Sequence, residues 1–134
     1  MSASTIFLVD DDAAHRNLVK RAIARAKITH AISEASSLVE ARRQLFSADR
    51  QTASFSLIIL DLNLTDGRST ALMSEIRASE AHRSLPILVL STSALQADVR
   101  ESYDCGASCY LTKADDMSAF SSEISAAVRF LLRL

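Results

Sequence analysis

Short apolar runs alternate along the chain with longer stretches in which apolar residues recur every three or four positions. The short runs are typical of buried or half-buried strands, and the longer stretches are typical of helices that pack one face against a core. Strands are predicted at Thr5–Asp10, Thr29–Ala35, Phe55–Asn63, Pro86–Ser91 and Cys109–Lys113. Helices are predicted from Asp11 or Asp12 to about Ala26, from Ser36 or Ser37 to about Ser47, over Thr70–Ser79 and Ala94–Tyr103, and from Asp115 or Asp116 to the C-terminus.

This alternation of strand and helix, repeated five times, predicts an α/β fold in one domain that spans residues 1–134. Strands joined through helices run parallel, and right-handed crossovers place helices on both faces of the sheet. We therefore expect a doubly wound (βα)5 fold with three layers, α/β/α, around a five-stranded parallel sheet. Ligands of such sheets bind outside the carboxyl ends of the strands. Polar residues at those ends are consequently the candidates for a functional site.

Composition narrows the class of protein. Hydrophobic residues make up 49% of the chain and the formal net charge is −1, so there is material for a core and no basic surplus for nucleic-acid binding. The apolar runs are too short to span a membrane, and the N-terminal residues lack the features of a signal peptide. Cys105 and Cys109 form neither a metal knuckle nor a disulfide framework, as is typical of reduced thiols. A cytoplasmic protein is expected.

Three carboxylates, Asp10, Asp11 and Asp12, directly follow the first apolar strand. Like charges this close disfavour ionisation unless a cation compensates them. Asp12 is better explained as a helix cap or a surface charge. Carboxylates are hard oxygen ligands that suit Mg²⁺, and Asp61 would approach the cluster from the end of a neighbouring strand. The pattern therefore predicts a Mg²⁺ site at this edge of the sheet.

Phosphoryl transfer is the chemistry that these strand ends support. An aspartate such as Asp61 can act as a covalent nucleophile toward phosphorus. Transfer places negative charge on the phosphoryl oxygens, which a metal ion and the ammonium of Lys113 would neutralise. The hydroxyl of Ser91, at the end of the fourth strand, supplies a hydrogen-bond donor at the same rim.

Four segments together resemble the receiver domains of bacterial two-component response regulators, over essentially the whole chain. They are "LVDDD", "IILDLNLTDG", "PILVLSTS" and "GASCYLTK". Asp61 and Ser91 stand 30 positions apart, and Ser91 and Lys113 stand 22 apart, as in that family. "LDLNL" and "LSTS" are most similar to the stand-alone regulators that accompany bacterial phytochromes. The resemblance implies a flavodoxin-like sheet with strand order 2-1-3-4-5.

The resemblance also implies a role for each matching residue. Asp61 would be the phosphoacceptor, with Ser91 and Lys113 contacting the phosphoryl group. The metal, Mg²⁺ or another divalent cation such as Mn²⁺, would be bound by Asp61, directly by Asp11, through a water by Asp10, and by the backbone carbonyl of Asn63. Ser91 and Tyr110 would form the switch, with the aromatic ring moving inward on activation. The three histidines, His15, His30 and His82, match no catalytic position and are expected at the surface or its boundary.

The resemblance implies a sensor histidine kinase as the phosphoryl donor, and the similarity to phytochrome-associated regulators suggests a bacteriophytochrome. The expected protein is a single-domain response regulator that catalyses only its own phosphorylation and dephosphorylation and is otherwise not an enzyme. No output domain is expected after the receiver. Signalling would then proceed through a changed surface presented to an unknown downstream protein, or through onward phosphorelay.

Three positions depart from the family pattern, and two rival interpretations stay open. Thr65 and Ala114 stand where proline is usual, and Ser69 stands where glycine is usual. The Lys113–Ala114 peptide is expected to be trans, because a cis bond before a residue other than proline costs about 2.5–4 kcal/mol.

One rival function is that of a pseudo-receiver, a binding module that is never phosphorylated. The other is a haloacid-dehalogenase-type phosphatase, a class whose nucleophile segment is D-x-D-x-T. Residues 61–65 of this chain, "DLNLT", match that segment except at Asn63, which replaces the second acid.

The C-terminal helix carries more apolar residues than one buried stripe can hold. Met117, Phe120, Ile124, Ala127 and Leu131 step by three or four residues and form a stripe that can pack on the sheet. The last residues add Val128, Phe130, Leu132 and Leu134, which point to several sides. An exposed apolar patch usually marks an interface. A homodimer is therefore predicted, built partly from this tail with two-fold symmetry.

Overall fold

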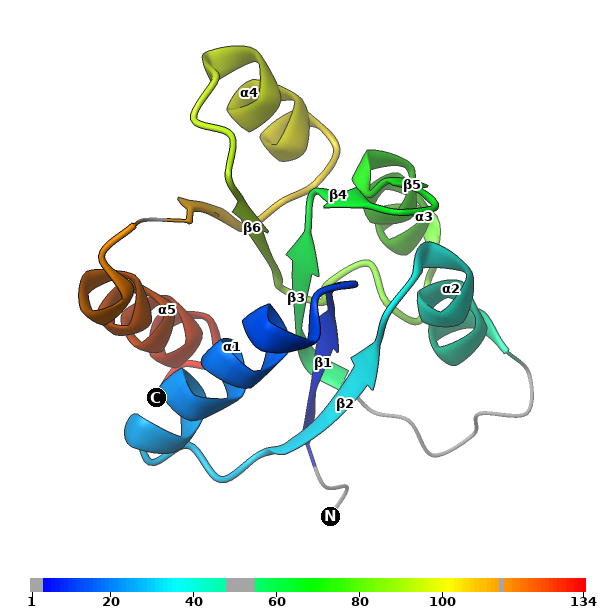
Figure 1. Cartoon of the computed structure of the whole chain (residues 1–134). Coiled ribbons are helices and arrows are strands. Elements are labelled where there is room, and N and C mark those ends of the chain that lie inside the picture. The colour runs from blue at the N-terminus through cyan, green and yellow to red at the C-terminus, as the bar shows by residue number, and fades with distance from the viewer. Residues whose placement is uncertain (1–3, 48–54, 114) are drawn as a thin grey trace.

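In the computed structural model, which describes residues 4–47, 55–113 and 115–134, five parallel strands form one central sheet. Along the sheet the order is β2-β1-β3-β6-β7 (Figure 1). Counted among the sheet strands alone, this is the order 2-1-3-4-5, so the predicted flavodoxin-like topology is confirmed. The strands are β1 (Thr5–Val9), β2 (Ala31–Ala35), β3 (Phe55–Asp61), β6 (Ile87–Ser91) and β7 (Cys109–Thr112).

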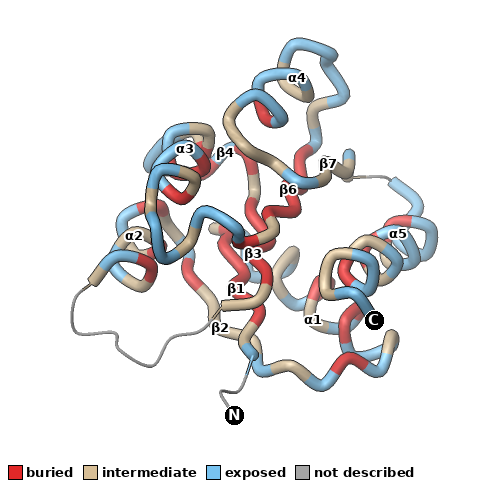
Figure 2. Tube along the Cα trace, turned by 180° about the vertical axis from the view of Figure 1, so that it is seen from behind, coloured by how far each residue is buried: buried red, intermediate tan, exposed pale blue. Residues whose placement is uncertain are grey.

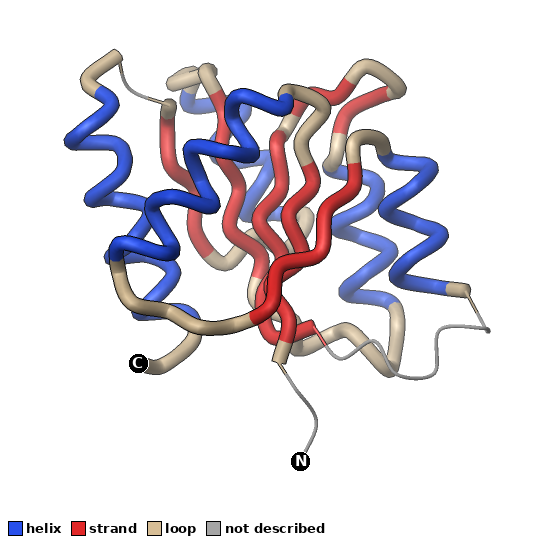
Figure 3. Tube along the Cα trace, turned by 60° about the horizontal axis from the view of Figure 1, so that its bottom comes forward, coloured by secondary structure: helices blue, strands red, loops and turns tan. Residues whose placement is uncertain are grey.

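Helices cover both faces of this sheet, as Figure 3 shows, which confirms the predicted three layers. Apolar side chains of α1 and α5 pack on one face, and those of α2 and α3 pack on the other. The fourth helix, α4, contacts β7 and buries only Ser102. The helices are α1 (Ala13–Arg25), α2 (Leu38–Phe46), α3 (Thr70–Ala78), α4 (Gln96–Asp104) and α5 (Met117–Leu131).

The core consists of two apolar clusters because successive residues of a strand point to opposite faces. In β1, Ile6 and Leu8 face α1 and α5, whereas Phe7 and Val9 face α2 and α3. β3 and β6 alternate in the same way, so all three central strands are buried on both faces (Figure 2). This double burial explains why their sequences read as continuous apolar runs.

Side-chain caps show at which of the two predicted residues α1, α2 and α5 each begin. Asp12 caps α1 by accepting from the backbone N–H of Ala14 at 2.9 Å, which leaves Asp11 free to face the neighbouring strand end. Ser37 caps α2 and Asp116 caps α5 in the same manner. The prediction that Asp12 serves as a helix cap is confirmed.

A small hairpin after β3 was not predicted. Its strands are β4 (Asn63–Leu64) and β5 (Gly67–Arg68). Gly67 has a φ of 144°, a conformation that residues with a Cβ rarely adopt, so glycine is required after the turn. Leu64 is buried and anchors the hairpin to the core.

Two further expectations concern membrane-spanning helices and the peptide bond that follows Lys113. Within the described residues, none of the helices is long and apolar enough to cross a membrane. The predicted trans peptide between Lys113 and Ala114 lies outside the described residues, because Ala114 is not among them.

Candidate functional site

The carboxyl ends of β1 and β3 bring three aspartates together. Asp10 and Asp11 follow β1, and Asp61 is the last residue of β3. One carboxylate oxygen from each of the three lies within 4.8 Å of the others. The Asp10 side chain is 3% exposed and that of Asp61 is 13% exposed, whereas Asp11 is the most exposed of the three, so the cluster lies at the edge of the sheet with its inner two carboxylates largely desolvated.

Burial disfavours the ionised form of Asp10. It raises the pKa of the Asp10 carboxyl, against the lowering effects of the Asp12 backbone N–H and the Lys113 ammonium. The Asp12 N–H donates to Asp10 Oδ1 at 2.9 Å, and Arg16 donates to the Asp10 backbone carbonyl at 2.7 Å. These contacts hold Asp10 in place although ionisation is disfavoured there. Three hard oxygen donors around a shared space are the donor set that suits a divalent cation.

Backbone contacts also orient Asp61 and Asp11. The N–H of Asn63 donates to Asp61 Oδ1 at 3.3 Å, and the hydroxyl of Ser69 donates to the Asp61 backbone carbonyl. The N–H of Thr65 donates to Asp11 Oδ2 at 3.0 Å. Proline at position 65 would lack this donor. Two departures from the family pattern, Thr65 and Ser69, therefore act on the position of the acidic cluster.

Lys113 enters the cluster from the end of β7. Its side chain is 9% exposed, and its Nζ lies 3.2 Å from Asp61 Oδ2 and 3.7 Å from Asp10 Oδ2. The backbone N–H of Lys113 donates to the carbonyl of Ser91 at 2.7 Å, which fixes the start of the side chain. The ammonium thus faces the carboxylate that was predicted to react.

His15 is a site residue that sequence reasoning missed. Its Nδ1 lies 2.9 Å from Lys113 Nζ and 3.7 Å from Asp10 Oδ2. His15 lies at the surface boundary as expected, with 37% of its side chain exposed, but the first turn of α1 also points it at Lys113, and this place in the site was not predicted. His82 bonds the backbone carbonyl of Leu45 instead. A signal was available in the sequence, since His15 stands three residues after the helix cap and so within one turn of the acidic cluster.

Ser91 and Tyr110 lie on the side of the site toward α4. Ser91 is 1% exposed, and its Oγ accepts from the N–H of Ser93 at 3.0 Å. Tyr110 is partly buried, and its hydroxyl donates to the carbonyl of Ser93 at 2.7 Å. Both predicted switch residues therefore form hydrogen bonds with the same loop residue, Ser93.

Arg68 connects the hairpin to α4, a link that was not predicted. Its Nη2 lies 2.7 Å from both Asp98 Oδ1 and Glu101 Oε1, and its Nη1 donates to Asn63 Oδ1 at 3.3 Å. Ser93 donates its hydroxyl to Asp98. The Ser93 hydroxyl and the Arg68 guanidinium hold the pKa of the Asp98 carboxyl below its usual range. The hairpin that follows β3 and the loop that follows β6 thus both contact α4.

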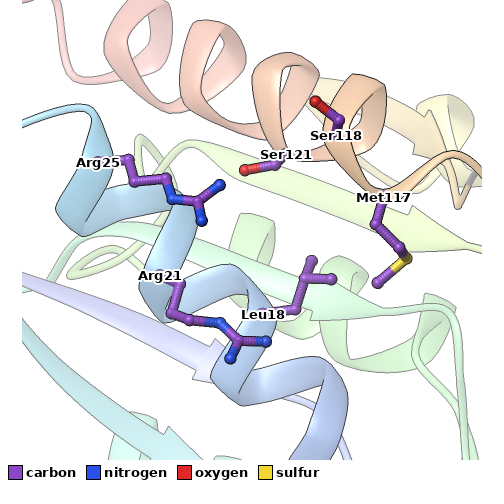
Figure 4. A pocket seen from close by; sticks show the side chains of 6 residues that line it. All are labelled: Leu18, Arg21, Arg25, Met117, Ser118 and Ser121. Carbon is purple, nitrogen blue, oxygen red and sulfur yellow. The ribbon is translucent and has the colours of Figure 1, made fainter.

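A separate hollow of about 340 Å³ lies between α1 and the start of α5. Figure 4 shows its two guanidinium groups on α1 and its two hydroxyl groups on α5. Within the described ranges, neither guanidinium is paired with a carboxylate. The hollow contains no member of the acidic cluster. It is lined by Leu18, Arg21, Arg25, Met117, Ser118 and Ser121.

Comparisons with known proteins agree with this geometry. The family model described as response regulator receiver domain matches residues 6–125. Response regulator Rcp1 of Synechocystis sp. is 29% identical over 118 residues, which cover 84% of this chain and 78% of that protein. The structure of the phosphorylated cyanobacterial phytochrome response regulator RcpA is 30% identical, with a TM-score of 0.87 over 96% of this chain and 93% of that one. The Mn²⁺-bound form of Rcp1 is 28% identical, with a TM-score of 0.86 over 96% and 94%.

Proposed function

This chain belongs to the response regulator receiver domain family, and from that premise we propose that Asp61 accepts a phosphoryl group from a sensor histidine kinase. The observation that carries the proposal is the position of Asp61. It lies at the end of β3 with one carboxylate oxygen 3.2 Å from the Lys113 ammonium, inside a cluster of three carboxylates. Phosphorylation would be the protein's signal, and the only reactions it promotes would be its own phosphorylation and dephosphorylation.

The acidic cluster fits the divalent cation that this reaction needs. Asp11 and Asp61 would bind Mg²⁺ or Mn²⁺ directly, Asp10 would act through a bound water, and Asn63 would offer its backbone carbonyl. The disfavoured ionisation of buried Asp10 supports this assignment, because a cation would relieve it. When bound, the ion neutralises charge that develops on the phosphoryl oxygens.

The side chains of the chain itself have distinct tasks in the transfer. A carboxylate oxygen of Asp61 attacks phosphorus, so an O–P bond forms while the bond from phosphorus to the donor histidine nitrogen breaks. Lys113 pairs its ammonium with a phosphoryl oxygen. Since Ser91 Oγ accepts from the Ser93 N–H, its own hydrogen is available to donate to the phosphoryl group.

Output is proposed to run through the surface of α4 and β7. Movement of the Ser91 hydroxyl toward a phosphoryl group would disturb the loop at Ser93, which also holds Tyr110 and Asp98. A population shift of this loop would change the surface offered to a downstream protein or to a phosphorelay partner. The switch role of Ser91 and Tyr110 is part of this proposal.

The kinase is proposed to be a bacteriophytochrome and the protein to act in the cytoplasm. Similarity to the cyanobacterial phytochrome response regulator RcpA supports the choice of kinase class. The free thiols of Cys105 and Cys109 are consistent with a reducing compartment.

A homodimer through α5 completes the proposal. Phe130 is 79% exposed and Leu134 is 58% exposed, so the end of the helix presents apolar side chains to solvent. The predicted buried stripe is partly wrong, because Met117 is exposed whereas Val128 is fully buried in the core. The exposed patch is therefore smaller than predicted and centred on Phe130.

Phosphorylation of the full chain by phosphoramidate, a small phosphodonor, tests the proposed function. With Mg²⁺ we expect one phosphoryl group per chain by intact mass, and none for Asp61→Asn, because an amide is not a sufficient nucleophile. Asp104→Asn, at an exposed position on α4, is the control and should be labelled like the wild type. Asp11→Asn should raise the Mg²⁺ concentration that gives half of the maximal rate.

Other outcomes would identify the rival functions. An unlabelled wild-type chain would indicate a pseudo-receiver. Sustained hydrolysis of a chromogenic phosphomonoester would instead indicate a phosphatase. Full labelling of the Asp61→Asn variant would place the phosphoacceptor elsewhere.

A further inference from the structure

The Lys113 ammonium is held by an uncharged acceptor as well as by carboxylates. His15 Nδ1 lies 2.9 Å from Lys113 Nζ. An ammonium can only donate hydrogen bonds, so Nδ1 must accept through its lone pair. This makes the imidazole neutral, with its proton on Nε2. The hydrogen bond connects residues 98 positions apart, and it ties the end of β7 to the first turn of α1.

The positions of the groups around the Lys113 ammonium indicate what the hydrogen bond to His15 does. Asp61 Oδ2 is within hydrogen-bond reach of Lys113 Nζ at 3.2 Å, whereas Asp10 Oδ2 is at 3.7 Å, beyond it. A lysine carries its charge on a flexible four-carbon chain, and both carboxylates attract that charge. The His15 ring, carried by a helix that Asp12 caps, adds a hydrogen-bond acceptor at a defined position to these two attractions. Among the described contacts of Lys113 Nζ, the His15 ring is the one uncharged partner, so its removal would leave the ammonium with carboxylates alone.

We propose that His15 is a positioning residue that holds the Lys113 ammonium where the phosphoryl oxygens of phosphorylated Asp61 will lie. This inference rests on the proposed function, and it assigns His15 no contact with the phosphoryl group. Gain and loss of the phosphoryl group both pass through states with charge on the same oxygens. A donor fixed in advance stabilises that charge without reorganising. His15 therefore accelerates both reactions through Lys113.

Two substitutions of nearly equal shape separate the acceptor from the packing. His15→Asn keeps an oxygen close to the place of Nδ1, whereas His15→Leu has no acceptor. For the full chain with saturating phosphoramidate and Mg²⁺, we expect His15→Leu to lower the rate constants of phosphorylation and of dephosphorylation, each by about 3- to 10-fold. His15→Asn should stay within about 2-fold of the wild type. The concentrations of donor and Mg²⁺ that give half of the maximal rate should not change.

Several results would overturn the assignment. Wild-type rates in His15→Leu would show that Lys113 needs no positioning. Equal losses in both variants would point to packing instead of the acceptor. A changed Mg²⁺ requirement with an unchanged maximal rate would place the effect of His15 on the acidic cluster.

A spectroscopic measurement keeps the inference testable if the proposed function fails. Nitrogen chemical shifts of the His15 ring in the wild type should show the Nε2–H tautomer with Nδ1 accepting, and Lys113→Met should shift the Nδ1 signal. A proton on Nδ1 would overturn the proposed contact whether or not Asp61 is phosphorylated. An unlabelled wild type with the expected ring signals would instead refute the proposed function alone.

Discussion

At the residue scale, the buried position of Asp10 determines how its charge affects the stability of the protein. Asp10 has the least exposed side chain, and its pKa is raised chiefly by burial. A raised pKa in the folded state means that folding disfavours the ionised carboxyl. The metal-free protein therefore gains stability from this group as the pH falls through the raised pKa toward the ordinary value of 3.8. Above that window the full penalty applies.

Asp10→Asn should accordingly stabilise the metal-free protein at neutral pH. The amide keeps an acceptor for the Asp12 N–H and removes a buried charge, so we expect the free energy of unfolding to rise by about 1 kcal/mol. The same variant should lose most of the stabilisation that Mg²⁺ gives the wild type. Urea unfolding with a chelator and with Mg²⁺ measures both effects, with Asp104→Asn as the control. A lower midpoint in the chelator would show that Asp10 is chiefly structural.

At the element scale, the hairpin of β4 and β5 joins the reactive loop to two helices. The Asp66 carboxylate accepts from the N–H groups of Leu38 at 2.9 Å and Val39 at 3.1 Å, at the start of α2. A helix N-terminus favours an anion. On the other side Arg68 reaches α4. The hairpin is therefore positioned from both ends, and with it the Thr65 N–H that contacts Asp11.

Asp66→Ala should destabilise the fold in a pH-dependent way. The N–H groups of Leu38 and Val39 lower the pKa of the Asp66 carboxyl, so its contribution is present above the ordinary value of 3.8 and is lost as the pH falls through the lowered pKa. The wild type should therefore lose its advantage over Asp66→Ala across that window, as measured by denaturant midpoints at each pH. Asp66→Asn, which keeps one acceptor without charge, should fall between the two. Equal midpoints for all three at neutral pH would contradict this account.

At the scale of the whole molecule, the exposed end of α5 sets the expected assembly. Phe130→Asp should raise the dimer dissociation constant by about tenfold or more, because each protomer loses a buried aromatic contact and gains a charge. Leu95→Asp, at a residue that is 69% exposed and lies just before α4, is the control and should leave the dimer intact. Sedimentation velocity of the unphosphorylated chains over a range of micromolar concentrations distinguishes these outcomes. A monomeric wild type would exclude the dimer.

The sequence by itself determined the layers, the strand order through its family resemblance, and the gathering of Asp10, Asp11, Asp61 and Lys113 at one edge. These features follow from local periodicity and from a general rule, because parallel strands place their carboxyl ends together. Burial on both faces of β1, β3 and β6 could be recognised from their continuous apolar runs for the same reason.

Only the tertiary structure decided the contacts between segments far apart in the chain. His15 meets Lys113, Thr65 meets Asp11, and Val128 rather than Met117 enters the core. Periodicity states which side of a helix is apolar, but it does not fix how far the helix is rotated and displaced against the sheet. A shift of one residue along α1 would turn His15 away from the site, since successive side chains of a helix point about 100° apart. The relative placement of α1, α5 and the hairpin is therefore what completed the site.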